Sequence, residues 1–189
     1  MDHGSKSTVL AALLAALTAA GALLSIPLPP PLPPVTLAVF FALMSGLLLG
    51  PLWGAASIGL YLFLGTIGLP VFANGAGGLG HFATPTGGFL LGYLAAAIVT
   101  GLFSDRREWK FPRSLSAALA GVFALYVVGV PWFRTVVDAI PDRDMSLAAA
   151  IVAMLPYLAG DVVKAVAAAA LAKALAPLLK DHLPHAEAR

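Results

Sequence analysis

The feature that most constrains this chain is a long stretch without charge. Between Thr8 and Ser104, 97 residues include no Asp, Glu, Lys or Arg. One buried helix cannot account for that length, whereas four membrane spans of about 20 residues and their connections can. The whole chain is 60% hydrophobic and 11% charged, with a mean hydropathy of +0.92, while soluble domains carry about 25% charged residues. The sequence therefore predicts an all-α integral membrane protein.

The composition also excludes several classes of function. The chain has no cysteine, so it forms no disulfide, no thiolate metal site and no thiol nucleophile. The net charge of +2 comes from loop residues, and no basic patch is interleaved with aromatic residues, so we expect no nucleic-acid partner. The sequence contains no Gly-x-x-x-x-Gly-Lys-Ser/Thr loop, so the chain does not hydrolyse ATP itself. We expect no cofactor.

Apolar segments separated by turn-forming residues predict six membrane spans in a single domain, at residues 8–26, 35–50, 54–69, 87–103, 114–130 and 157–179. Pro156 separates the last span from a short segment at 148–155, because proline suits the first turn of a helix. A cleaved signal peptide is the alternative for the first segment. Its apolar region is longer than the usual 7 to about 15 residues, which favours a span.

Two connections and one helix face carry unusual residues. Pro27 to Pro34 predicts a stiff extended loop, because proline lacks an N–H and holds the preceding residue extended. Residues 70–86 are rich in glycine, which lets backbone approach a ligand closely; a flexible loop is the alternative. Alanines at four-residue spacing in the first span form a smooth strip for a second helix, unless alanine is simply abundant. They are Ala11, Ala15 and Ala19, with Ala12, Ala16 and Ala20 alongside.

Positive charges predict the orientation in the membrane. Cytoplasmic loops carry an excess of Lys and Arg, and the connections after the first and third spans have none. With six spans, both termini then lie inside, although the connection after the fifth span, with Arg134 and Arg143, is a mild exception. The charges that set this orientation are Arg106, Arg107, Lys110, Arg113, Lys180 and Arg189.

An acid and a base stand three residues apart in the last span, at Asp161 and Lys164. They project about 60° apart on one helix face. Each ion costs roughly 2.5 to 3.5 kcal/mol in mid-bilayer, so the pair indicates a functional site; a structural salt bridge is the alternative. If the span begins near Tyr157, the two residues lie roughly 6 and 10 Å below the outer boundary. The pattern predicts an outward-facing pocket beneath the loops.

Four motifs resemble those of one family. They are Gly65 to Phe72, Gly77 to Gly80, Pro85 to Tyr93 and Gly160 to Ala165. Together they closely resemble the BioY family, the biotin-binding S component of energy-coupling factor (ECF) transporters. The resemblance implies a six-helix S-component fold in the prokaryotic cytoplasmic membrane, capture of biotin from outside, and partners comprising a transmembrane scaffold and two ATP-binding-cassette ATPases. It also implies that the strip of Ala11, Ala15 and Ala19 docks on the scaffold.

The resemblance further implies which residues bind the ligand. Asp161 and Lys164 belong to the ligand site, where the carboxylate can accept from a ureido N–H and the ammonium can donate to the ureido carbonyl. The glycine-rich loop contributes as well, and aromatic side chains offer apolar walls. The expected set adds Asn74, Gly75, Gly77, Gly78, Tyr93 and Tyr157.

Two other functions remain open on the sequence. One is an S component for a different small vitamin. The other is a membrane-embedded enzyme that uses Asp161 with His81 or Lys164 as acid and base. The sequence contains no pair of histidines at metal-ligand spacing and no second carboxylate within a predicted span, which argues against the enzyme.

Overall fold

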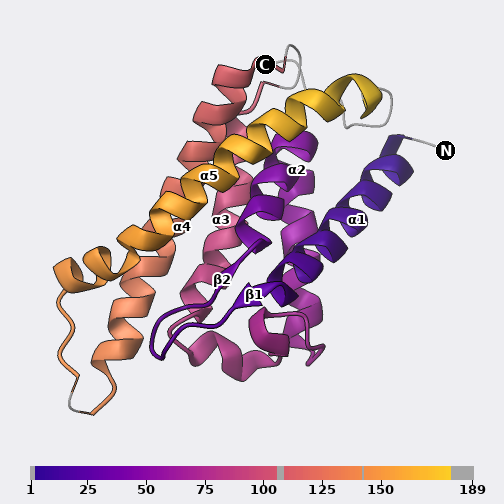
Figure 1. Ribbon diagram of the computed structural model, residues 1–189. Helices are drawn as coiled ribbons and strands as arrows, with labels where there is room; N and C mark the ends of the chain where they lie inside the picture. The colour runs from indigo at the N-terminus through magenta and orange to yellow at the C-terminus, as the bar shows by residue number, and fades with distance from the viewer. Residues whose placement is uncertain (1–2, 106–108, 142, 180–189) are drawn as a thin grey trace.

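The computed structural model describes residues 3–105, 109–141 and 143–179. Its helices are α1 (His3–Leu23), α2 (Ala38–Thr66), α3 (Gly87–Phe103), α4 (Phe111–Asp138) and α5 (Leu147–Leu179), with short 3-10 turns η1 (Ala73–Gly75) and η2 (Leu79–Ala83) and strands β1 (Ser25–Ile26) and β2 (Val35–Thr36). The first residues of α1 and the last of α5 lie at one end of the bundle, and the strands and 3-10 turns gather at the other (Figure 1).

Four of the described helices, α1, α2, α4 and α5, are long and apolar enough to cross a membrane, and α3 is apolar but shorter, with 17 residues. The prediction of a mostly helical membrane protein is confirmed. Of the charges used to predict the orientation, Arg106, Arg107, Lys180 and Arg189 lie outside the described residues.

Helix α2 doubles back on itself at Gly50. The backbone there has φ 80°, which glycine adopts without strain, and Pro51 then starts the second segment. The hydroxyls of Ser45 and Ser57 lie 3.4 Å apart, although twelve residues of straight helix would separate them by roughly 18 Å. Residues 38–49 and 51–66 therefore pack against each other, as the predicted spans 35–50 and 54–69 with a turn at Gly50–Pro51 require.

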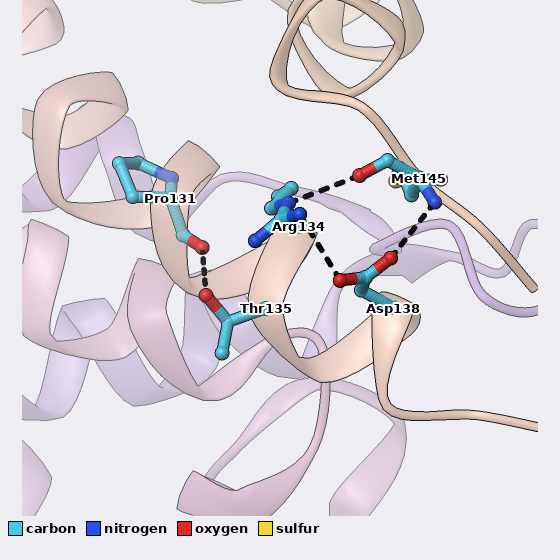
Figure 2. A network of polar contacts seen from close by, with 5 residues as sticks. All are labelled: Pro131, Arg134, Thr135, Asp138 and Met145. Carbon is cyan, nitrogen blue, oxygen red and sulfur yellow. Dashed lines mark hydrogen bonds and ion pairs between the residues drawn. The ribbon is translucent and has the colours of Figure 1, made fainter.

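Some predicted boundaries were wrong. Residues 25–26 and 35–36 are not helical but pair as antiparallel strands, Ser25 with Thr36 and Ile26 with Val35, because Pro27 holds the residue before it extended. Helix α4 continues beyond residue 130 to Asp138, through Pro131. Membrane helices tolerate such a proline because neighbouring helices and local adjustments satisfy the freed backbone groups. One turn beyond the proline, Thr135 Oγ1 donates to the Pro131 carbonyl at 2.9 Å (Figure 2).

The last span does not begin at Pro156, since α5 is one helix from Leu147 to Leu179 with that proline inside it. Asp161 therefore lies roughly 21 Å along the axis from the start of α5, at about 1.5 Å per residue. Only the expected start of the helix at Tyr157 was wrong, and the depth of the pair in the membrane stays a prediction. The acid–base pair lies near the middle of the helix.

Helix α3 packs between α2 and α4 at very short range. A Cβ added at Gly46 would lie 2.4 Å from the Ala97 carbonyl oxygen, and one added at Gly92 would lie 2.9 Å from the Leu125 carbonyl oxygen. Small residues allow such backbone approach between membrane helices, where lipid supplies no hydrophobic driving force. This packing brings α2, α3, α4 and α5 around one interior space.

The expected docking strip on α1 is mostly buried within this chain. Ala11 and Ala15 are 5% and 2% exposed, on the face that packs against α2, and Ala19 is half-buried. These alanines serve the close approach of α1 to the rest of this chain. The exposed face carries the neighbouring strip of Ala12, Ala16 and Ala20.

A polar network pins the connection between α4 and α5 (Figure 2). Arg134 Nε donates to the Met145 carbonyl at 3.0 Å, and Asp138 accepts from the Met145 N–H at 3.1 Å. Arg134 and Asp138 also form an ion pair at 3.1 Å. These contacts fix the end of α4 against the residues that precede α5.

Candidate functional site

A cavity with about 60 Å³ of free space, partly open to solvent, lies beneath the loops at one end of the bundle. Both charged residues of the α5 pair line it, as do four tyrosines, one from each of α2, α3, α4 and α5. The lining comprises Ala22, Pro33, Pro34, Val35, Thr36, Val39, Tyr61, Ala73, His81, Thr86, Phe89, Leu90, Tyr93, Leu125, Tyr126, Met154, Tyr157, Asp161 and Lys164.

Asp161 is the polar centre of this cavity, with its side chain 7% exposed. Its Oδ1 accepts from Lys164 Nζ at 2.8 Å, and its Oδ2 accepts from the Tyr126 hydroxyl at 2.7 Å. A carboxylate has about four acceptor positions and an ammonium three donors, so both groups keep capacity for a ligand. Tyr126 fixes the carboxylate from α4, on the opposite side from Lys164.

The proline-rich loop is held over the cavity by α5. The Tyr157 hydroxyl donates to the Pro33 carbonyl at 2.6 Å, and Pro33 and Pro34 both line the cavity. This contact joins residues 124 positions apart in the chain. Tyr157, which was expected to offer an aromatic wall to the ligand, thus also holds the proline-rich loop in place.

The glycine-rich loop covers the cavity and is held there by contacts with neighbouring backbone. Asn74 is exposed and exchanges hydrogen bonds with Ser25, which donates to its Oδ1 at 2.9 Å. The Gly78 N–H donates to the Gly65 carbonyl at 2.7 Å, and a Cβ at Gly77 would lie 2.4 Å from the Leu69 carbonyl oxygen. These residues tie the loop to β1 and to α2 instead of lining the cavity.

His81 and Ala73 supply the wall that this loop presents to the cavity. The imidazole stacks on Phe72, with ring centroids 5.3 Å apart, and its Nε2 lies 3.2 Å from Thr86 Oγ1. Burial lowers the pKa of His81 below its ordinary value of 6.5, so the ring is neutral at pH 7. A neutral imidazole leaves the Asp161–Lys164 pair as the charged part of the lining.

Of the eight ligand-binding residues expected from sequence, four line the cavity: Asp161, Lys164, Tyr93 and Tyr157. The other four, Asn74, Gly75, Gly77 and Gly78, lie in the covering loop outside its lining. Sequence reasoning missed Tyr61 and Tyr126. A tyrosine within an otherwise apolar span was the available signal, because a buried hydroxyl needs a polar partner.

The described residues offer no group of three His, Cys, Asp or Glu side chains able to hold a metal ion. The chemistry available in the cavity is therefore hydrogen bonding to a charged pair and tyrosine hydroxyls, with apolar packing around them. That arrangement suits capture of a small, partly polar molecule.

Comparison with known proteins gives consistent matches. A biotin transporter BioY of Rhodobacter capsulatus is 42% identical over 130 residues, which are 65% of this chain and 68% of the relative. One from Thermotoga maritima is 36% identical over 67% of this chain and 70% of its own. A crystal structure of the S-component for biotin from an ECF-type ABC transporter superposes with a TM-score of 0.79 and 27% identity, covering 91% of each chain. The family model of BioY matches residues 1–181. This chain belongs to the BioY family.

Proposed function

We propose that this protein is the biotin-binding S component of an ECF transporter. The observation that carries the proposal is the buried Asp161–Lys164 pair, which lies in a loop-covered cavity together with Tyr126. The family membership and the names of the relatives support biotin as the ligand. They also support a transporter subunit over an enzyme.

The ureido ring of biotin matches the polar centre of the cavity. A ureido group offers two N–H donors and one carbonyl acceptor, and Asp161 with Lys164 offers the complementary acceptor and donor in one place. Hydrogen bonds to ionised groups are about twice as strong as neutral ones. Phe89, Leu90 and Met154 give the rest of the ligand apolar contact.

We further propose the arrangement in the membrane. The two segments of α2 each cross, giving six crossings with both termini in the cytoplasm and the loop-covered cavity facing outward. The charges at Lys110 and Arg113, at the start of α4, then lie inside. The location is the cytoplasmic membrane of a prokaryote.

Uptake driven by ATP needs partners, because the sequence has no phosphate-binding Gly-x-x-x-x-Gly-Lys-Ser/Thr loop. We propose a transmembrane scaffold and two ATP-binding-cassette ATPases as these partners. The strip of Ala12, Ala16 and Ala20 on α1 is exposed, and its small side chains let a second helix approach closely between the larger exposed Val9, Leu13 and Leu17. It is the docking face that replaces the buried Ala11 and Ala15.

Binding to the purified protein tests the ligand. In lipid nanodiscs, calorimetry with biotin, riboflavin and thiamine in separate titrations is expected to give tight binding for biotin only. Binding of another vitamin in place of biotin would make the protein an S component for that vitamin. Heat from none of them would contradict the proposal.

A further inference from the structure

The Tyr61 hydroxyl is a buried polar group without a partner in the described part of the chain. The residue lies in the second segment of α2, is 1% exposed and lines the cavity. Buried hydroxyls are nearly always hydrogen-bonded, because leaving one unpaired costs its desolvation. The cavity that Tyr61 lines can supply this missing partner.

The surroundings of Tyr61 keep its ring in place. Its ring meets Phe72 edge-to-face, with centroids 5.5 Å apart and planes at 75°, and Phe72 is itself fully buried. Phe72 stacks in turn on His81 of the covering loop. With the ring held by this stack, the hydroxyl cannot swing to a distant partner, so it is oriented before any ligand arrives.

Tyr61 and Asp161 belong to different sides of the cavity. Tyr61 packs in the cluster formed by α1, α2, α3 and the glycine-rich loop, whereas the carboxylate and its donor Tyr126 come from α5 and α4. Tyr93 packs against both hydrophobic clusters and lies between these sides. The cavity thus has a second polar point away from the charged pair.

We propose that the Tyr61 hydroxyl hydrogen-bonds directly to bound biotin, at an acceptor atom that Lys164 does not take. This inference rests on the proposed function and adds a specificity-determining residue to that site. Biotin suits two separated contacts, because its ureido ring and its carboxylate stand at opposite ends of the molecule.

The test compares Tyr61→Phe with Thr100→Val in nanodiscs. Thr100 is a matched control, because its hydroxyl is the other buried one without a partner among the described residues, yet it does not line the cavity. We expect Tyr61→Phe to weaken biotin binding about tenfold, as loss of one hydrogen bond to the ligand requires. Its ligand-free melting temperature stays equal to the wild type or rises, because an unpaired hydroxyl is removed. Thr100→Val keeps wild-type affinity.

The outcomes separate the two proposals. Wild-type protein that does not bind biotin overturns the proposed function. Wild-type protein that binds, with Tyr61→Phe binding equally well, overturns this inference alone. A fall in the ligand-free melting temperature of Tyr61→Phe, or an equal loss of affinity in Thr100→Val, also overturns it, since the effect would then be structural.

Discussion

A double-mutant cycle on Asp161 and Lys164 separates binding from stability. The two side chains are 7% and 15% exposed and 2.8 Å apart, so they behave as a buried pair. Removing one partner of such a pair costs about 3–5 kcal/mol of unfolding free energy, because the other charge stays buried without compensation. An exposed pair would cost about 1 kcal/mol or less.

The variants are Asp161→Asn, Lys164→Gln and their combination. Each single variant is expected to lose about 3 kcal/mol or more. The combination is expected to lose less than the sum by about 1–3 kcal/mol, since no uncompensated charge remains. Both amides keep a hydrogen-bonding group at their positions, and position 161 can still accept from Tyr126.

Equilibrium unfolding in nanodiscs measures the stability, and calorimetry with biotin measures the binding. The double variant loses less stability than the two single losses added together, yet it does not regain affinity, because the ligand has lost both charged partners. If the double variant bound biotin like the wild type, the pair would be a structural salt bridge and the proposed recognition would be refuted. Strictly additive losses of stability would refute the coupling.

Three further predictions concern the surfaces around the site. Ala16→Trp, on the exposed face of α1, spares biotin binding but abolishes co-purification with the scaffold, because a large side chain blocks close helix approach. Gly65→Ala weakens biotin binding about tenfold by calorimetry, since its Cβ would lie 2.1 Å from the buried Phe72 ring and overpacking costs about 1–3 kcal/mol. Biotin affinity falls as the pH drops below about 6.5, because burial lowers the pKa of His81 and protonation of the ring therefore disfavours its packed position at the cavity wall.

Each of these predictions has a control within the chain. Phe123→Trp, at a position 72% exposed on α4, keeps scaffold binding; its loss there too would remove α1 from the interface. Gly59→Ala, in the same helix as Gly65 but with nothing within 4 Å, keeps affinity. Equal losses in both glycine variants would contradict the packing argument. His81→Gln removes the pH dependence, and its persistence would assign the titration to another group.

Local patterns in the sequence predicted much of the fold. The charge-free run, the six apolar segments and the turn at Gly50–Pro51 depend on composition and on neighbours along the chain. The i, i+3 relation of Asp161 and Lys164 follows from helix geometry alone, and their ion pair at 2.8 Å agrees with it. The proline positions predicted helix ends wrongly at Pro131 and Pro156, where the helices continue. Tertiary contacts can outweigh the one hydrogen bond that a proline removes.

What the sequence determined by itself is therefore a polytopic helical protein with a charged pair inside it and two irregular loops. Only the tertiary structure decided which hydroxyls meet that pair, which face of α1 is free, and that Asn74 holds the loop to Ser25 instead of lining the cavity. These features join residues 35 and 49 positions apart or depend on which neighbour covers a helix face. Periodicity says which residues share a face, but packing against other helices determines what that face meets.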